Sequence, residues 1–378
     1  IHGADDLYRP TGVIAESEKN ASKLFGCPTV YSTEGSSLAI RAMLYLAYTQ
    51  AGCKGRCLVG RNAHKSFLYA AMLLDFPIRW LRAGNNYLSC SVSAEAVETA
   101  VLEMPEKPFA VFLTSPDYLG NISDIHRISE TCRKYGIPLL VDNAHGAYLK
   151  FLPSSQHPMD LGADMCCDSA HKTLPVLTGG AYLHFRDPRM ADRIKGAMAL
   201  FGSTSPSWLI LQSLDAANPY LERLPDTSAA PTYCIAALKK ALLKHGFSLI
   251  GDEPWKLTLC AAKWGYSGAE IASLLERVNI FCEFADQDFI VFMLTPQNTS
   301  EQLKFLQKTL CEIPKREPKP EVSLPSAIPE VVCSPHQAAF ALQERIPIEH
   351  SLGRVLADAN VSCPPAVPIV MCGERIDK

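Results

Sequence analysis

The chain has 378 residues, enough for one large domain of roughly 200 residues with smaller ones beside it. Its hydrophobic content is 48%, its charged content 20% and its formal net charge −3. These values describe a globular protein without the basic face that nucleic acid binding needs. No run of about 18 apolar residues occurs, so we expect no membrane attachment.

The fourteen cysteines are scattered, and several lie within apolar runs where a thiol behaves as a small hydrophobic group. This usage predicts a reducing, cytoplasmic compartment. Cys53 and Cys57 are the closest approach to a metal-binding pair. Because no second pair or histidine cluster completes a set of four ligands, we predict no metal site.

A helix start near residues 35–37 is the first candidate binding element along the chain. Gly35, Ser36 and Ser37 precede an apolar helical pattern over residues 38–48. The free amides and positive dipole end of such a helix can bind a phosphate, with the serine hydroxyls as further donors. From this stretch alone, a serine that only caps the helix is an equally good interpretation.

Short apolar runs at residues 57–60, 109–114, 139–141 and 163–168 predict buried strands of a mainly parallel sheet. The helical pattern over residues 122–135 joins the second and third runs as a crossover helix. The sequence therefore predicts an α/β fold.

Asp142 and Lys172 follow two of these strands, at the edge where open α/β sheets bind ligands. Pyridoxal phosphate (PLP) chemistry uses both groups. A lysine amine forms a Schiff base with the cofactor, and a carboxylate keeps the pyridine nitrogen protonated. The plainer alternative is a loop-capping acid and a solvated surface lysine.

The segments VDNAHGA, LGAD and SAHKTLPVLTGGAYLHF resemble signatures of the Orn/Lys/Arg decarboxylase family, and the similarity is collinear over nearly the whole chain. This resemblance implies the aspartate aminotransferase-like fold of PLP-dependent enzymes. It also implies a homodimer, possibly within a higher oligomer, with the active site at the subunit interface. Members of the family usually have about fifty further residues before the segment that matches position 1, so we expect that part to be missing here.

The resemblance also assigns roles to single residues. Lys172 and Asp142 match the Schiff-base lysine and the acid that pairs with the pyridine ring. The matching residues around the cofactor are Gly35, Ser36 and Ser37 at its phosphate, His64 stacked on its ring, Ala144 on the opposite face, His145 near the substrate, and Ser169 and His171 beside the lysine.

Two further residues match positions outside this group. Thr204, in the segment FGSTSPSW, matches a threonine that reaches the phosphate of the partner subunit. Glu374 matches a glutamate that we expect near the far end of a basic substrate, although a terminal surface acid is an equally good interpretation. The chain departs from the family pattern at Asp117, Gly179 and Ala366, where threonine, glutamine and glycine are usual.

Composition divides the chain into four parts. We predict a large PLP-binding domain at residues 1–218, a small α/β domain at 219–312, an extended proline-rich linker at 313–335 and a C-terminal domain at 336–378.

The sequence thus predicts a decarboxylase that converts arginine, lysine or ornithine to the amine and CO2 through a Lys172 Schiff base, in polyamine synthesis. Two alternatives stay open, namely another PLP enzyme of the same fold, such as an aminotransferase or lyase, and a shortened paralogue that binds PLP without turnover. A dinucleotide-binding protein is disfavoured, because no G-x-G-x-x-G segment follows a strand.

Overall fold

The computed structural model describes residues 5–81, 87–320, 328–359 and 367–377. The chain divides into two compact units, and each contains its own sheet. The first unit comprises Ile1–Ser115, Ser123–Glu222 and Leu324–Lys378, and the second comprises Pro116–Ile122 and Arg223–Ser323. Within the described residues, no helix has the length and apolar character needed to cross a membrane.

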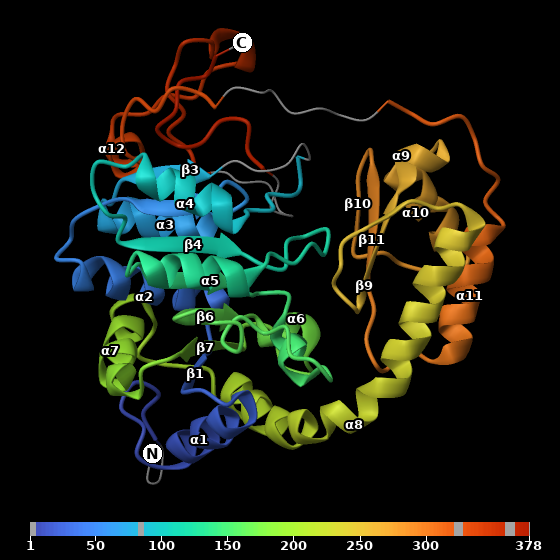
Figure 1. Ribbon diagram of the computed structural model, residues 1–378, viewed down its shortest axis with the longest axis horizontal. Coiled ribbons are helices and arrows are strands. Elements are labelled where there is room, and N and C mark those ends of the chain that lie inside the picture. Colours follow the sequence, from blue (N-terminus) through green and yellow to red (C-terminus); the bar gives the residue numbers. More distant parts are fainter. Residues whose placement is uncertain (1–4, 82–86, 321–327, 360–366, 378) are drawn as a thin grey trace. The chain divides into compact units, whose positions relative to one another are not determined.

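A seven-stranded sheet forms the centre of the first unit (Figure 1). Its strands are β1 (Thr29–Ser32), β2 (Cys57–Gly60), β3 (Ile78–Leu81), β4 (Ala110–Thr114), β5 (Leu139–Asp142), β6 (Met165–Asp168) and β7 (Ala181–Phe185). The spatial order is β1-β7-β6-β5-β4-β2-β3. The five neighbouring strands β6, β5, β4, β2 and β3 run parallel, while β7 is antiparallel to both of its neighbours.

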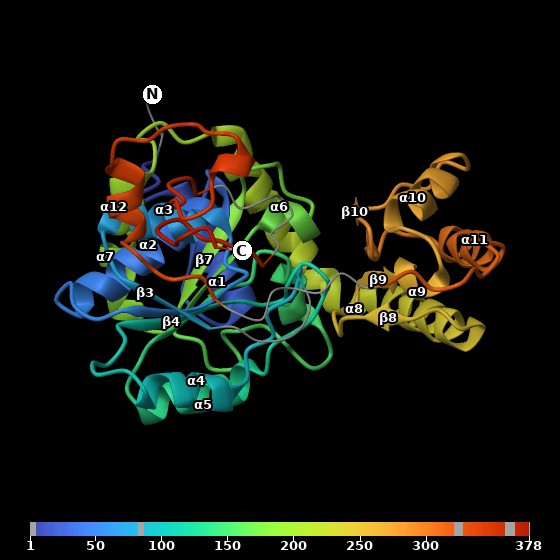
Figure 2. The ribbon, with the colours of Figure 1, turned by 90° about the horizontal axis from the view of Figure 1, so that it is seen from above.

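Helices cover both faces of this sheet, with α2, α3 and α7 on one side and α4 and α5 on the other (Figure 2). The helices and turns of this part are α1 (Val13–Phe25), α2 (Gly35–Gln50), α3 (Lys65–Leu74), α4 (Ala94–Leu102), α5 (Ile125–Lys134), η1 (Ala147–Phe151), α6 (Ala170–Thr173), η2 (Pro188–Met190) and α7 (Ala191–Phe201). Along β4, Ala110 and Phe112 pack into one core, and Val111 and Leu113 into the other. Because the strands of the seven-stranded sheet are buried on both faces, they appear in the sequence as continuous apolar runs.

The second unit contains a four-stranded antiparallel sheet in the order β10-β11-β9-β8. Its elements are β8 (Leu249–Ile250), β9 (Lys256–Cys260), α9 (Ala261–Trp264), α10 (Gly268–Glu276), β10 (Phe284–Ala285), β11 (Phe289–Met293) and α11 (Ser300–Cys311). Capping boxes begin α10 at Ser267 and α11 at Thr299. In each, the N-cap hydroxyl accepts from the backbone amide of the third helical residue, and the side chain of that residue accepts from the N-cap amide.

The predicted domain boundaries differ from this division. The boundary at residues 218/219 falls inside α8 (Trp208–His245), a continuous helix through three prolines. The first residues of the predicted linker pack against the second unit. The indole of Trp264 donates to the Ile313 carbonyl at 3.1 Å, and the Arg316 guanidinium lies 4.1 Å from the centre of the Tyr266 ring.

The C-terminal segment belongs to the same unit as the large sheet. It contains α12 (Pro335–Phe340) and η3 (Ile348–His350). Ala338, Met371 and Cys372 share an apolar cluster with Leu68 and Met72 of α3. The segment therefore covers the helix that follows the His64 loop.

Candidate active site

Asp142 ends β5 in the middle of the parallel strands, and its side chain is buried. Its Oδ1 accepts a hydrogen bond from the Ala144 amide at 3.2 Å and a weak one from the Cys167 thiol at 3.8 Å. Burial raises the pKa of Asp142, although His64 and Lys172 nearby oppose the shift. A buried carboxylate with so few donors is stabilised by a positively charged partner.

Lys172 lies in α6, a single helical turn just after β6. Its Nζ is 3.1 Å from Nε2 of His145, which follows β5. The side chain of His145 is buried, whereas that of Lys172 is exposed. The parallel pairing of β5 and β6 therefore brings together the two loops on which the sequence places the acid and the lysine.

The N-terminus of α2 has the features of an anion site. No side chain caps this helix, so the interpretation of Ser36 or Ser37 as its capping residue is wrong. Gly35 has φ +70°, and a Cβ placed on it would meet no atom within 4 Å. The Gly35 amide donates to the Gly179 carbonyl at 2.7 Å, which fixes the start of the helix against the loop after Lys172.

Four serine hydroxyls from three segments meet beside this helix end. Ser169 donates to the Ser36 hydroxyl at 2.8 Å. The Ser37 and Ser66 hydroxyls lie 2.7 Å apart, and Ser66 in turn lies 2.9 Å from Nδ1 of His64. Hydroxyls that satisfy one another can turn toward a phosphate when one is present, because a hydroxyl hydrogen rotates freely.

His64 is the N-cap of α3, and its Nδ1 accepts from the Ser66 amide at 3.2 Å. Burial lowers the pKa of His64 below its ordinary value, even though Asp142 acts to raise it. His64, Asp142 and Lys172 are close enough to influence one another electrostatically. The structure thus gathers these three residues, with His64 as a neutral ring.

Ala144 and His171 lie on the segments that follow β5 and β6, beside Asp142 and Lys172. Ala144 is buried beside Asp142, to which it donates its amide. Nδ1 of His171 lies 3.0 Å from the Gly180 carbonyl, so this histidine connects α6 to the start of β7. Both contacts are made within the chain, and they hold the loops on either side of Lys172.

Thr204 and Glu374 come from two further segments, the loop before α8 and the C-terminal segment. Thr204 is exposed in the loop before α8. Glu374 is 1% exposed, and its carboxylate makes a bidentate ion pair with the fully buried Arg61, at 2.7 Å for each oxygen. Since both oxygens are occupied, this arrangement does not favour the predicted contact with substrate. Instead, Glu374 joins the C-terminal segment to the start of the loop that carries His64.

The departures from the family pattern have local explanations. Asp117, in the second unit, accepts from the Leu119 and Asn121 amides at 3.0 and 2.9 Å, so its carboxylate holds its own loop. Gly179 has φ +99°, and a Cβ there would come within 2.9 Å of the Thr33 carbonyl. A glutamine at this position is therefore incompatible with the observed backbone. Ala366 lies outside the described residues.

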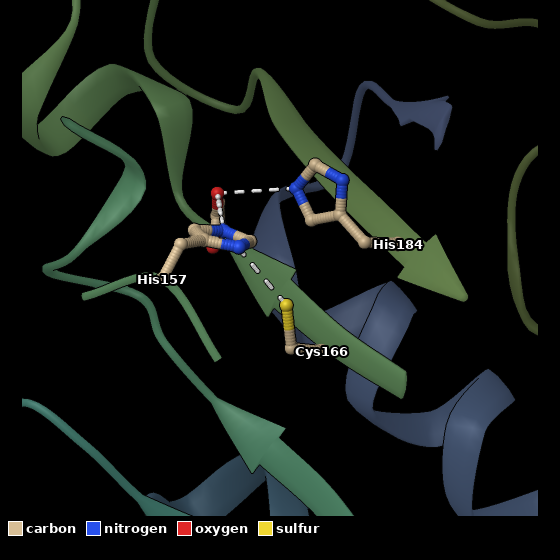
Figure 3. Close-up of side chains that lie close together, drawn as sticks. His157, Cys166 and His184 are labelled. Atoms are coloured by element: carbon tan, nitrogen blue, oxygen red, sulfur yellow. Dashed lines mark hydrogen bonds and ion pairs between the residues drawn. The ribbon is translucent and has the colours of Figure 1, made fainter. Parts of the chain in front are cut away.

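One cluster of buried polar side chains was not predicted from the sequence. His157 and His184 each place Nε2 at 3.1 Å from Oδ2 of Asp168, and Cys166 lies beside them (Figure 3). Burial alone would raise the pKa of Asp168, but the two histidines lower it far below its usual value. One sequence feature could have indicated this group: Cys166 and Asp168 are two residues apart on one strand, and the next strand carries His184.

Comparison with known proteins assigns this fold to a class. The solved structure of the Francisella novicida lysine decarboxylase LdcF matches with a TM-score of 0.82 at 18% identity, over 99% of this chain and 67% of that one. Together with the sheet topology, this match confirms the predicted aspartate aminotransferase-like fold of PLP-dependent enzymes.

The sequence comparisons define the family. Residues 1–242 match the family described as Orn/Lys/Arg decarboxylase, major domain. The chain is 31% identical over its whole length to YaaO of Bacillus subtilis, described as an uncharacterized protein, and covers 82% of it. It is 30% identical to the arginine decarboxylase of the same organism, of which it covers 81%. The chain belongs to the Orn/Lys/Arg decarboxylase family, and the predicted enzyme class, PLP-dependent amino acid decarboxylases, is confirmed.

Proposed function

We propose that the protein removes CO2 from a basic amino acid, namely arginine, lysine or ornithine, with PLP as its cofactor. Family membership supports the reaction, and the relative named arginine decarboxylase supports a basic substrate. The observation that carries the proposal is Asp142, a buried carboxylate with few donors that lies close to the Lys172 amine and the His64 ring.

The donors in this site fit PLP. Lys172 would hold the cofactor covalently through its amine, and Asp142 would hold a proton on the pyridine nitrogen. Ser36, Ser37 and Ser169, with the amides at the N-terminus of α2 that follow Gly35, match a phosphate. The open space at Gly35 leaves room for that phosphate, since even a Cβ there would contact nothing.

When bound, PLP supplies an electron sink for the electron pair that remains after CO2 leaves. The chain contributes orientation and charge. Asp142 stabilises the positive charge on the ring nitrogen from a buried position, where such an interaction is worth several kcal/mol. The neutral imidazole of His64 presents a flat face next to Asp142 without adding a competing positive charge.

His145 is positioned to move a proton at Lys172. Their nitrogens are 3.1 Å apart, which is hydrogen-bonding distance. When one nitrogen holds a proton and the other does not, the pair shares it, so His145 can take a proton from Lys172 or return one. We therefore propose His145 as the residue that sets the protonation state of the lysine amine.

Our proposal includes a homodimer in which Thr204 contributes to the site of the partner subunit. Its support is the exposure of Thr204 in a loop of the single chain, together with the family resemblance. A cytoplasmic location and a role in polyamine synthesis stay predictions.

The test combines an absorbance spectrum of the full chain with PLP and a measurement of CO2 release from arginine, lysine and ornithine. We expect the absorbance of a lysine-bound cofactor and CO2 from one substrate. Lys172→Ala should lose both, because no other amine would hold the cofactor. Lys150→Ala is the matched control, since its amine pairs with Asp160 instead. Transfer of the amino group to a keto acid would favour an aminotransferase, and cofactor binding without reaction would favour a silent paralogue.

A further inference from the structure

Four side chains of metal-binding type meet in the interior of the first unit. They are His157, Cys166, Asp168 and His184, and all four residues are buried (Figure 3). One atom from each, either a ring nitrogen, a sulfur or a carboxylate oxygen, lies within 4.8 Å of the corresponding atom of every other. The proposed reaction uses none of these groups.

Strand geometry explains how the group is assembled. Cys166 and Asp168 are two residues apart on β6, so their side chains point to the same face of the sheet. His184 is the direct partner of Cys166 in the antiparallel pairing of β6 with β7. His157 reaches the same place from the loop after η1. The donors thus come from two rigid strands and one loop.

The distances are close to those of a tetrahedral zinc site. Zinc binds nitrogen, oxygen and sulfur at about 2.0 to 2.3 Å, so its ligand atoms lie roughly 3.2 to 3.8 Å apart. Here Oδ2 of Asp168 is 3.1 Å from Nε2 of both histidines, and Sγ of Cys166 is 4.0 Å from Nε2 of His157. The other pairs of these atoms lie within 4.8 Å of one another, so shifts of about 1 Å would bring every pair to the separation that zinc requires.

Contacts behind these atoms also match a metal site. Nδ1 of His184 lies 2.8 Å from the Thr29 hydroxyl, which itself donates to the Cys27 carbonyl at 3.0 Å. Oδ1 of Asp168 accepts from the Asn143 amide group at 2.7 Å, which leaves Oδ2 to the histidines. Metal-binding imidazoles and carboxylates are commonly held by such outer hydrogen bonds.

Charge favours a divalent cation in this position. A zinc ion with one thiolate, one carboxylate and two neutral imidazoles has zero net charge, which suits a fully buried pocket. Without a metal, Nε2 of each histidine is in hydrogen-bonding distance of Asp168, and the Met159 amide donates weakly to Nδ1 of His157 at 3.4 Å. Zinc would replace both contacts of Nε2 with Asp168 by bonds to the metal, and it would move the His157 hydrogen to Nδ1, so the long contact with the Met159 amide would also be given up.

We infer that His157, Cys166, Asp168 and His184 bind one structural zinc ion. All four tetrahedral positions are filled by protein atoms, which is the arrangement of a structural site, whereas a catalytic site keeps one position open. The mixed nitrogen, sulfur and oxygen ligands suit zinc better than magnesium or calcium, which prefer oxygen alone. The ion would join β6 and β7 to the loop after η1, next to Asn143 and Ser169.

The experiment measures zinc in the full chain after expression in zinc-supplemented medium and dialysis against a mild chelator. We expect about one zinc per chain, as determined by mass spectrometry of the metal. Cys166→Ala and His184→Asn should each lose at least 80% of it. Cys132→Ala, a buried cysteine on α5, and His126→Asn, an exposed histidine on the same helix, are matched controls that should retain the metal.

A second readout does not depend on how well the variants fold. Cobalt(II) exchanged into the wild-type chain should show the intense visible bands of a tetrahedral site and a thiolate-to-cobalt absorption. Wild-type chain without zinc would overturn the inference and leave a closed hydrogen-bonded group. Zinc retained by the double variant Cys166→Ala and His184→Asn would also overturn it, because the metal would then be bound elsewhere.

Discussion

Asp142 and Asp168 end neighbouring parallel strands, and both are buried, yet their surroundings have opposite effects. Asp142 accepts one amide and one thiol, and burial raises its pKa. For Asp168, burial also acts to raise the pKa, but two histidines outweigh that effect and lower it. Asp142 is therefore suited to bind a positively charged ligand, whereas Asp168 already has two histidines of the chain as partners.

The sharpest test of this comparison replaces each aspartate by asparagine. Asp142→Asn should reduce turnover by about 1,000-fold, or about 4 kcal/mol, because the neutral amide no longer stabilises the charged ring nitrogen. Asp168→Asn should instead lower the stability of the chain by about 3 to 5 kcal/mol, since it breaks a buried charged group. Turnover by the loaded enzyme and urea unfolding measure the two effects.

The cofactor-free chain gives this test its control. A carboxyl group whose pKa is raised by folding contributes stability only at low pH, and that contribution is lost as the pH rises through the folded pKa. At pH 8 the Asp142 carboxylate therefore destabilises the empty site, and Asp142→Asn should raise the melting temperature. A lower melting temperature, together with normal turnover, would contradict the difference we draw between the two aspartates.

Much of this arrangement could be predicted from local sequence. Strands buried on both faces give continuous apolar runs, so local sequence predicted where β5 and β6 end and that Asp142 and Lys172 lie at or just after those ends. The partners of Asp168 could not be recognised in this way, because they lie on other segments and meet only through the pairing of β6 with β7. The ion pair of Glu374 with Arg61 joins residues 313 positions apart, a separation that no local pattern reports.

Glu374 extends the comparison to a third buried carboxylate, one with a full counter-charge. Glu374→Gln leaves the buried Arg61 guanidinium with one oxygen acceptor and no negative charge beside it. We therefore expect the free energy of unfolding to fall by about 3 kcal/mol and the C-terminal segment to be proteolysed faster. Glu330→Gln removes an exposed pair with Arg375 and should cost less than about 1 kcal/mol. Equal effects of the two variants would show that burial of the Arg61 pair does not matter.

A Ser36→Ala variant tests whether the serine hydroxyls beside the N-terminus of α2 bind the cofactor phosphate. The described donor to Ser36 is the Ser169 hydroxyl, so removal of the Ser36 hydroxyl should cost the empty chain little stability. Loss of a hydrogen bond to a doubly charged phosphate should weaken PLP binding about tenfold, a change of about 1.4 kcal/mol. Titration of the absorbance with PLP measures this change, with the exposed Ser154→Ala as control. Unchanged affinity in Ser36→Ala would place the phosphate elsewhere.

Cys132 gives an effect as small as that of Ser36, and it extends the comparison to a buried group with no partner role in either site. Burial raises the pKa of Cys132 to about 12, from an ordinary value near 9. The folded chain therefore holds this proton between about pH 9 and 12 while the unfolded chain releases it, so stability falls as the pH rises above 9. At pH 10 the loss is about 1.4 kcal/mol. Cys132→Ala should reduce the fall in urea stability between pH 8 and 10 by that amount. An unchanged slope in Cys132→Ala would mean that burial of this thiol does not suppress its ionisation.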